Sequence, residues 1–444
     1  MKPLLVVSGP VSTRSGYGSH TRDLVRSLVD MDKFDIHVNS LPWGNCPMNA
    51  LNEKDENDKI IIDRIMKDGN LSRQPDVHIQ VSVPNEFAPM AKYNIGITAG
   101  IETTSPKPEW IEGLNRMDFN IVPSTFAKGV FQNAVYDRMD ENTKQKVGEL
   151  RLNKPMEVLF EGVDTNIFKK TKTFSEDFVN EMKSISESFV FLYTGHWLQG
   201  KLGQDRKDTG MLVKTFLETF KNKPKQPALL MKTSGATFSI IDKNEIMKKI
   251  EDIKNTVSGK LPNIYFLHGD LSDDEMNEMY NHPKVKAHIN LTHGEGFGRP
   301  LLEASLSEKP IIASNWSGHL DFLPNKLAVL LPGAMVDVPK SGLSKDYRVD
   351  GAKWFTVNYQ HASRIMLDMV KNYRKYTLNA KKLAMGNRGK YSLKSMTKTF
   401  DAILQKYLPK FEEAPQQVDL KLPKLKKVGD TAPKKIQLPK LKKV

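Results

Sequence analysis

Two successive series of alternating strand and helix patterns constrain the fold of this chain most strongly. Amphipathic segments separate many of the short apolar runs, as in MLVKTFLETF after Gly210. The runs lie at residues 4–9, 34–39, 76–83, 93–99 and 119–124, and then at 189–195, 227–234, 263–269, 285–292 and 309–314. Strands that alternate with helices form parallel sheets, with function at the carboxyl ends of the strands. The sequence therefore predicts an α/β protein with two doubly wound, Rossmann-like domains that face one cleft.

The segment FEGVDTNIFKKTKT, residues 160–173, separates the two series. It is polar and irregular in pattern, which is typical of a linker between domains. We therefore expect an N-terminal domain over residues 1–170 and a C-terminal domain over residues 171–389. Helical sequence from about residue 361 to 408 should close the body, and a Lys/Pro-rich tail follows at residues 411–444.

Two carboxylates flank the loop between the last two runs of the second series. HGEGFGRPLLE, residues 293–303, places Glu295 and Glu303 eight positions apart, across a glycine-containing turn that leads into a helix. At that helix start the backbone N–H groups of Gly296, Phe297 and Gly298 would be free, and the dipole favours anions and hydroxyl oxygens. Carboxylates accept hydrogen bonds from vicinal hydroxyls, so the pair fits a pocket for a sugar nucleotide. Taken alone, the spacing also fits a capped helix with two surface glutamates.

THGEGFGRPLLEAS, followed by KPIIASNWSGHLDFL, resembles the signature of the retaining glycosyltransferases of family four. Other stretches fall in the order that this family shows, so the resemblance covers residues 1–410 approximately. It implies the two-domain GT-B fold, in which a terminal helix, here about residues 390–410, crosses back onto the N-terminal domain. It also implies that Glu295 contacts the donor sugar, that Glu303 contacts the ribose of the nucleotide, and that the reaction needs no metal.

Basic residues early in the second series are candidates to neutralise a diphosphate leaving group, which arginine and lysine do well. In FLYTGHWLQGKLGQDRKDTGMLV, from residue 191, His196 stands where the family has an arginine, and Arg206 and Lys207 precede a helix as in a family variant. The resemblance therefore assigns the diphosphate to Arg206 and Lys207, which join Glu295 as candidate catalytic residues. His196 is expected to be a neutral donor, and Lys232 and Arg299 add positive charge on the donor side. The alternative for Arg206 and Lys207 is a solvated basic loop.

Two N-terminal stretches resemble segments that face the acceptor in the family. Residues 16–20 read as a glycine-rich loop, although their spacing does not match the dinucleotide fingerprint G-x-G-x-x-G. Residues 100–131 resemble the E-T-x-x-x-P-x-W and vPS-F segments, in which Trp110 is expected to pack. The acceptor-side candidates are Gly16, Tyr17, Gly18, His20, Glu102, Thr103, Thr104 and Ser124. The family often presents a histidine from this domain, but GIETT stands here, so the sequence does not identify a catalytic base in the N-terminal half.

The net charge of +14 is concentrated in the tail. Residues 421–444 hold nine lysines and one aspartate, a net +8, which leaves +6 for the rest of the chain. LPKLKKV occurs at 422–428 and again at 438–444, and such a sequence buries too little apolar surface to fold alone. We expect a disordered tail that binds nucleic acid. A solubilising extension, a duplicated docking motif and a membrane-surface anchor are the alternatives.

The tail makes DNA with a modified base, of the kind that bacteriophages produce, the leading acceptor. Saccharide, lipid-linked and protein acceptors are alternatives in the same reaction class. A non-catalytic nucleic-acid-binding protein on a GT-B scaffold is the alternative from another class, and a GT-B sugar-nucleotide epimerase is a further one.

Composition limits the remaining possibilities. No apolar run reaches the roughly 18 residues of a membrane span, and residues 3–7 are too short for a signal peptide, so we expect a cytoplasmic protein. The single cysteine, Cys46, excludes an intramolecular disulfide and a multi-cysteine zinc site, and no oriented histidine is identified for a nucleophilic role. The acidic run DLSDDE, residues 270–275, fits a helix cap and not a calcium loop. A nucleotide sugar is the expected co-substrate, and no metal or other cofactor is expected.

Overall fold

A computed structural model describes residues 2–411 apart from 68, 70, 72, 141, 236, 345 and 346. Its first sheet is six-stranded and parallel, in the order β2-β1-β3-β4-β5-β8. The strands are β1 (Leu4–Gly9), β2 (Asp35–Ser40), β3 (Val77–Val81), β4 (Tyr93–Ile97), β5 (Phe119–Val122) and β8 (Met156–Val158). The five predicted strands of the first series are thus confirmed, and β8 is added at the edge.

Helices follow the strands of this sheet. They are α1 (Gly16–Met31), α2 (Glu56–Ile62), the short 3-10 helix η1 (Pro84–Glu86), α3 (Pro108–Arg116) and α4 (Thr125–Asn133). The expected glycine-rich loop at residues 16–20 is wrong in one respect, because these residues form the first turns of α1. Ser15 caps the helix by accepting a hydrogen bond from the Gly18 N–H at 3.0 Å, so the helix begins before the second glycine.

The second sheet is also six-stranded and parallel, in the order β11-β10-β9-β12-β13-β14. Its strands are β9 (Val190–His196), β10 (Ala228–Ser234), β11 (Ile264–Leu267), β12 (Val285–Asn290), β13 (Ile311–Ser314) and β14 (Val329–Leu331). The helices are α5 (Glu176–Lys183), α6 (Thr209–Phe220), α7 (Ile240–Lys254), α8 (Asp273–Asn281), α9 (Arg299–Ser305) and the 3-10 helix η2 (Gly318–Asp321). The strand order reverses between β9 and β12, which is where open α/β sheets bind ligands.

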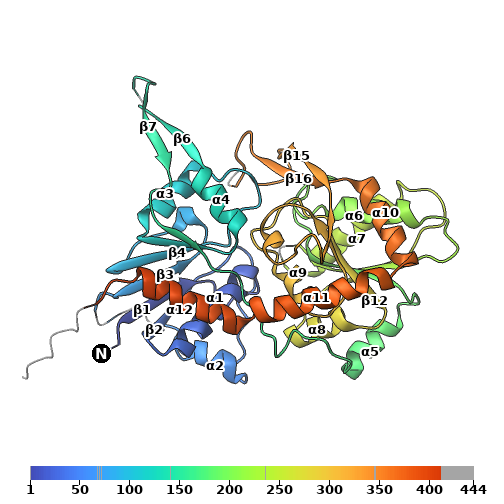
Figure 1. Cartoon of the computed structure of the whole chain (residues 1–444), viewed down its shortest axis with the longest axis horizontal. Coiled ribbons are helices and arrows are strands. Elements are labelled where there is room, and N and C mark those ends of the chain that lie inside the picture. Colours follow the sequence, from blue (N-terminus) through green and yellow to red (C-terminus); the bar gives the residue numbers. More distant parts are fainter. Residues whose placement is uncertain are drawn as a thin grey trace, which may run out of the picture. The chain divides into compact units, whose positions relative to one another are not determined.

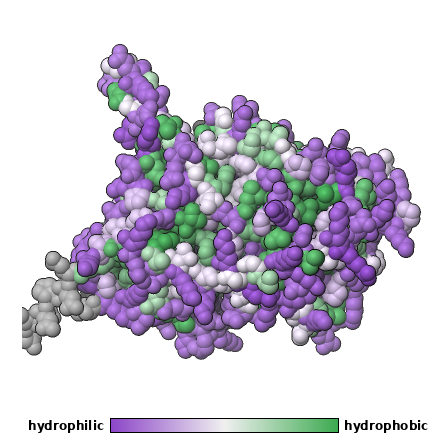
Figure 2. Space-filling model, viewed as in Figure 1, coloured by the Kyte–Doolittle hydropathy of each residue, from purple (hydrophilic) through white to green (hydrophobic). Residues whose placement is uncertain are grey.

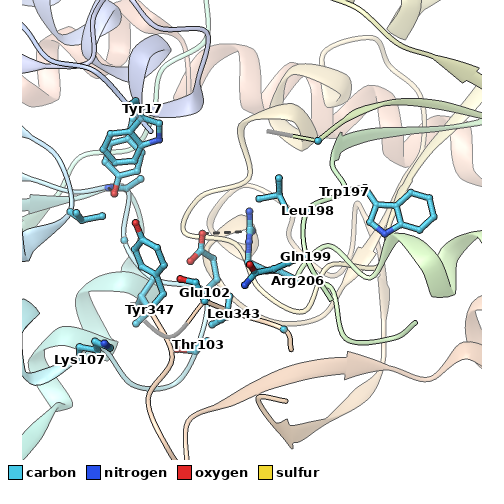
Figure 3. A pocket seen from close by; sticks show the side chains of 18 of the residues that line it. Tyr17, Glu102, Thr103, Lys107, Trp197, Leu198, Gln199, Arg206, Leu343 and Tyr347 are labelled. Atoms are coloured by element: carbon cyan, nitrogen blue, oxygen red, sulfur yellow. Dashed lines mark hydrogen bonds and ion pairs between the residues drawn. The ribbon is translucent and has the colours of Figure 1, made fainter. Parts of the chain in front are cut away.

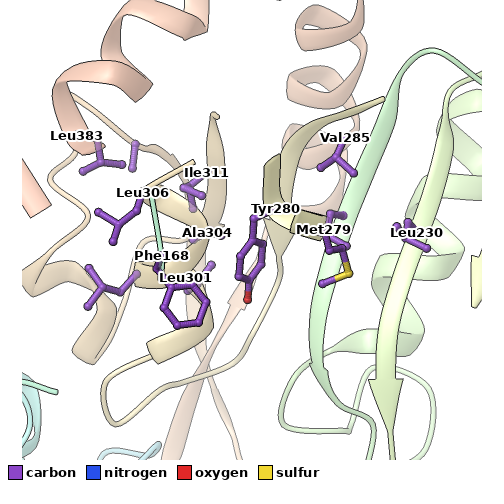
Figure 4. Packing of buried hydrophobic residues seen from close by; sticks show 14 of the residues in the cluster. Phe168, Leu230, Met279, Tyr280, Val285, Leu301, Ala304, Leu306, Ile311 and Leu383 are labelled. Carbon is purple, nitrogen blue, oxygen red and sulfur yellow. The ribbon is translucent and has the colours of Figure 1, made fainter. Parts of the chain in front are cut away.

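An apolar cluster holds α9 against the second sheet. Figure 4 shows Leu301 and Ala304 of α9 together with Tyr280 of α8 and Ile311 of β13, and all four are at most 2% exposed. Buried parallel strands require such continuous apolar surfaces on both faces. The position of α9, and of the loop that precedes it, is therefore fixed by the core of the second sheet.

Three helices end the described chain: α10 (Tyr359–Lys371), α11 (Arg374–Lys390) and α12 (Leu393–Tyr407). The last of these, in red in Figure 1, packs against α1 beside the first sheet. Thr397 donates to the Ser27 hydroxyl of α1 at 2.9 Å, and Tyr407 stacks on Phe119 of β5 at 4.1 Å. The chain thus returns to the N-terminal sheet, while the boundaries expected at residues 170 and 389 stay a prediction.

Two antiparallel hairpins were not predicted. One pairs β6 (Val135–Met139) with β7 (Lys146–Arg151), and the other pairs β15 (Gly333–Asp337) with β16 (Lys353–Val357). Both lie along the upper edge of the view in Figure 1. The second hairpin supports the loop after β12, because the Phe355 N–H donates to the His293 carbonyl at 3.0 Å.

The described surface combines polar helices with scattered apolar residues. On the face shown in Figure 2, hydrophilic side chains cover most of the outer helices. The two most exposed large apolar side chains of α11, Leu378 and Met385, are 61% and 72% exposed. No helix among the described residues is long and apolar enough to cross a membrane.

Candidate functional site

The loop between β12 and α9 carries the two predicted carboxylates. The Glu295 N–H donates to the Ser317 hydroxyl at 2.9 Å, and the Glu295 carbonyl accepts from the Gly318 N–H at 2.9 Å. Gly298 has φ +94°, a left-handed conformation that favours glycine, and it directly precedes α9. The predicted order of strand, loop, helix and strand is confirmed, and the segment after β13 holds the loop in place.

Glu295 lies against two cations from the loop after β9. The Lys207 Nζ donates to both carboxylate oxygens at 2.5 and 2.7 Å, and the Arg206 Nη1 lies 3.5 Å from Oε2. Burial opposes ionisation of Glu295, but Lys207 and Arg206 outweigh it and lower the pKa to about 2. Burial also lowers the pKa of Lys207, which Glu295 partly offsets. The three predicted catalytic residues are therefore brought together, at the strand-order reversal between β9 and β12.

Arg206 also faces Glu102, which lies in the loop after β4 of the first sheet. Its Nη1 lies 3.6 Å from the Glu102 Oε1 and donates to the Gly294 carbonyl at 3.1 Å. Figure 3 shows this pair between Tyr17 and Tyr347 on one side and Trp197 on the other. The space they line has a volume of about 760 Å³, within the usual range for sites that hold small molecules.

Two glycines of the loop make close contact with the segment that follows β4. A Cβ on Gly294 would lie 2.2 Å from the Glu102 carbonyl oxygen, and one on Gly296 would lie 2.0 Å from the Ala99 oxygen. The Ser124 hydroxyl, which caps α4, donates to the Gly296 carbonyl at 2.6 Å. These positions need glycine because the two chain segments touch there.

The loop's amides and its phenylalanine differ in accessibility to a ligand. Among the described residues, no acceptor is found for the N–H groups of Gly296, Phe297 and Gly298. The Phe297 side chain is 2% exposed and packs on Phe322 at 5.0 Å, within the apolar core. Only its backbone is therefore available to a ligand.

The second carboxylate, Glu303, is held by two neighbours. The Arg299 Nε donates to Oε1 at 2.9 Å, and the Tyr280 hydroxyl donates to Oε2 at 3.3 Å. Burial raises the pKa of Glu303 to about 7, and Asp273 adds to the rise while Arg299 opposes it. Arg299 also donates to Asp23 of α1 at 2.5 Å, so its charge is already shared by two carboxylates.

The remaining donor-side candidates are His196 at the end of β9 and Lys232 in β10. His196 bonds the Ser234 hydroxyl through Nδ1 at 3.1 Å. Desolvation and the positive charges of Lys207 and Arg206 lower the pKa of His196 to about 4, so the imidazole is neutral at pH 7. The Lys232 Nζ donates to the Gly269 carbonyl at 2.7 Å, and burial lowers the pKa of this lysine.

The predicted acceptor-side residues separate into two groups. Tyr17, Glu102 and Thr103 line the cavity. The others make structural contacts among the described residues. Gly18 lies close to the Thr13 carbonyl, His20 is buried beside Asp23 and Arg299, and Gly16 is the first residue of α1. Thr104 forms two hydrogen bonds with Lys353, and the Ser124 hydroxyl donates to the Gly296 carbonyl. Desolvation lowers the pKa of His20 to about 4, so it too is neutral.

Several lining residues were missed by sequence reasoning. Trp43 stacks on Tyr17 at 4.0 Å, and Tyr347 meets Trp110 edge-on at 6.1 Å. Trp110 packs as predicted, at 7% exposed, but it also lines the cavity together with Lys107. Trp43 is an aromatic residue in the Pro/Gly-rich loop PWGNCPMN, and this placement was its one local signal in the sequence.

The acidic run at residues 270–275 caps a helix, as predicted. Ser272 and Glu275 form a reciprocal capping box at the start of α8. Within the described part of the chain, no cluster of three or more histidine, cysteine, aspartate or glutamate side chains could hold a metal ion. Burial raises the pKa of the Cys46 thiol, which disfavours the nucleophilic thiolate.

Comparison with known proteins identifies the fold. No protein-family model and no curated protein sequence matches the chain. Solved structures do match: Anabaena HepE in complex with UDP-glucose (13% identity, 91% of this chain and 100% of that chain, TM-score 0.57) and sucrose-phosphate synthase from Thermosynechococcus elongatus (11%, 91% and 99%, 0.59). A glycosyltransferase from Rickettsia africae matches at 14% identity, over 92% of this chain and 99% of that chain, with a TM-score of 0.58. The predicted GT-B fold, with two Rossmann-like domains, is confirmed.

Proposed function

We propose that this protein is a retaining glycosyltransferase that takes its sugar from a nucleotide-sugar donor. The Glu295–Lys207–Arg206 group carries this proposal, because it combines a carboxylate with two cations at the strand-order reversal of the second sheet. Fold neighbours support the donor class, since HepE was crystallised with UDP-glucose. Arginine and lysine stabilise a departing diphosphate, and a carboxylate accepts hydrogen bonds from sugar hydroxyls.

Each residue has a separate role in this mechanism. Arg206 and Lys207 stabilise the diphosphate, Glu295 and the amides of Gly296 to Gly298 orient the sugar, and Glu303 accepts hydrogen bonds from the ribose. Lys207 now donates to both Glu295 oxygens, so the pair is already ordered before substrate binds. Preorganised charge of this kind lowers a barrier without reorganisation during the reaction. The leaving phosphate takes the proton of the acceptor hydroxyl, and the configuration at the anomeric carbon is retained.

We infer that the acceptor is DNA with a hydroxyl-bearing modified base. Two features support this: the tail at residues 421–444, which carries a net +8 and lies outside the described residues, and the aromatic rings of Tyr17, Trp43 and Trp110 around the cavity. A base extruded from a duplex is held by stacking, worth about 1–3 kcal/mol per base on an aromatic side chain. The tail would add phosphate contacts and longer residence on DNA.

The donor assignment is tested first by mass spectrometry of nucleotide sugar bound to the purified protein. Turnover is then measured with a panel of nucleotide sugars. Glu295→Gln should reduce turnover about 100-fold, the usual cost of removing one preorganised electrostatic group. Glu251→Gln on the exposed face of α7 is the matched control and should keep turnover unchanged. Equal turnover in Glu295→Gln and wild type, with a donor that the wild type uses, would falsify the assignment.

The acceptor assignment is tested in a separate comparison of substrates. The same donor is offered with duplex DNA that contains a hydroxymethylated base and with free saccharides, at low and high salt. We expect transfer to DNA that falls steeply with salt, and loss of DNA binding after deletion of residues 411–444. Salt-independent transfer to a free sugar, with no transfer to DNA, would overturn the DNA acceptor and leave the donor assignment intact.

A further inference from the structure

Arg299 joins the two sheets through one guanidinium group. Its Nη1 donates to the Asp23 Oδ2 at 2.5 Å, and its Nε donates to the Glu303 Oε1 at 2.9 Å. Asp23 lies on helix α1, which packs on the N-terminal sheet, whereas Arg299 and Glu303 lie on helix α9, which packs on the second sheet. The side chains of Asp23, Arg299 and Glu303 are 8%, 15% and 10% exposed. We call these three residues the interdomain bridge.

Charged groups of both signs surround the bridge, and the Arg26 Nη1 lies 3.6 Å from the second Asp23 oxygen, Oδ1. Glu161 and Asp273 are close enough for Arg299 to act on their ionisation, and burial raises the pKa of both. Glu161 is 7% exposed, and its pKa is raised to about 7. The four carboxylates around Arg299 together raise its own pKa well above its usual value, against the effect of burial. Four carboxylates therefore act on Arg299, and Arg299 is the residue that donates hydrogen bonds to both Asp23 and Glu303.

Asp23 anchors the guanidinium of Arg299 in the orientation that engages Glu303. A guanidinium can donate two parallel hydrogen bonds to one carboxylate. Here Nη1 is held by Asp23 and Nε by Oε1 of Glu303, which fixes the orientation of the guanidinium, and Oε2 of Glu303 accepts from the Tyr280 hydroxyl. Each oxygen keeps lone-pair capacity for a further donor. Without Asp23, Arg299 would be free to turn and bond both Glu303 oxygens.

We propose that Asp23 is a positioning residue for the donor, which acts through Arg299 to keep Glu303 open to the ribose hydroxyls. This inference rests on the proposed function, in which Glu303 contacts the ribose. Because Asp23 belongs to the N-terminal sheet, the ribose contact is complete only while the two sheets are in contact at this point. Donor binding and closure of the two domains then favour each other, since coupling between two equilibria is reciprocal.

The test compares two nucleotides that differ only at the ribose. Calorimetry first finds which of UDP, ADP and GDP binds the wild type most tightly, and that nucleotide is then compared with its 2′,3′-dideoxy form. The wild type should prefer the ribose form. Asp23→Asn should reduce this preference about 10-fold, the scale of one hydrogen bond to a charged group, and should leave binding of the dideoxy form nearly unchanged.

Two further variants keep the result interpretable. Arg299→Lys lacks the planar fork that serves two partners and should show the same ribose-specific loss, including in the case that Asp23→Asn does not fold. Asp30→Asn, on an exposed position of the same helix, is the matched control and should bind both nucleotides as the wild type does. Thermal unfolding of each variant reports structural damage independently of the ribose preference.

The outcomes separate the inference from the proposed function. Equal weakening of both nucleotides in Asp23→Asn would mean a structural role and would overturn the inference. If Glu303→Gln abolishes the ribose preference and Asp23→Asn does not change it, the ribose contact stands and the positioning role fails. If Glu303→Gln also leaves the preference unchanged, or if none of the three nucleotides binds, the donor site itself is refuted.

Discussion

Gly296→Ala tests whether contact between the two sheets is needed for activity. Gly296 does not have a positive φ, so its backbone conformation accepts alanine. The added Cβ would nevertheless lie 2.0 Å from the Ala99 carbonyl oxygen, across the boundary between the sheets. The substitution therefore changes one contact between the domains, without a demand on local conformation.

The size of the effect follows from the distances. Ordinary contact begins at 3.4 Å, so the oxygen must move from 2.0 to 3.4 Å, about 1.4 Å. The same movement would lengthen the 2.6 Å hydrogen bond from Ser124 to the Gly296 carbonyl beyond bonding range. It would also separate Glu102 from Arg206. A displacement of about 1 Å at a reacting centre can cost 10²-fold in rate, so we expect transfer to fall about 100-fold.

The assay combines transfer, nucleotide binding and thermal unfolding. UDP binding should weaken by no more than about 10-fold, because Arg206, Lys207 and Glu303 all come from the second sheet and only the positioning of Glu303 by Asp23 depends on contact between the sheets. Gly386→Ala in α11 is the control, because its Cβ would meet no described atom within 4 Å, and it should keep activity and gain about 0.5–1 kcal/mol of stability. Transfer by Gly296→Ala at the wild-type rate would refute the argument that the sheets must touch here.

The remaining predictions concern protonation and the cysteine. Because the pKa of Glu303 is raised to about 7, its carboxylate gains charge as the pH rises through 7, so the donor KM should fall between about pH 6 and 8 and Glu303→Gln should remove this dependence. The same raised pKa means that Glu303 lowers stability as the pH rises from about 4.5 to about 7, and a comparison of thermal unfolding of wild type and Glu303→Gln across this window checks the sign. Cys46→Ser should keep turnover unchanged, and wild-type Cys46 should react slowly with iodoacetamide because burial raises its pKa; a strong loss of turnover would contradict this.

Buried parallel strands were the most predictable part of the fold. LLVVSG and IIAS are continuous apolar runs because both faces of their sheets are covered, and the structure places β1 and β13 there. The β6–β7 hairpin has no such pattern, since most of its residues are exposed and its charges pair within the hairpin, as in Lys146 with Asp137. The strands β15 and β16 are separated by 15 residues and carry no tight-turn signal, so their pairing was not apparent.

The sequence predicted only part of the structural role of the glycines in the loop after β12. The sequence suggested free amides at the start of a helix, a local property of the motif. The close contacts of Gly294 and Gly296 with the Glu102 and Ala99 carbonyls are made by residues nearly 200 positions earlier in the chain. No pattern within the loop could indicate them. The same limit applies to Asp23, which looks like an ordinary polar position on an amphipathic helix.

Arg299 shows how a distant contact alters the role that a motif suggests. From its position in the loop, it was a candidate cation for the donor. In the structure its guanidinium is shared by Asp23 and Glu303, so little of its charge remains for a phosphate. Arg206 and Lys207 together carry +2 against Glu295, and they lie at the strand-order reversal. If transfer occurs as proposed, the diphosphate must rely on these two residues, and Arg299 must act through Glu303 on the ribose.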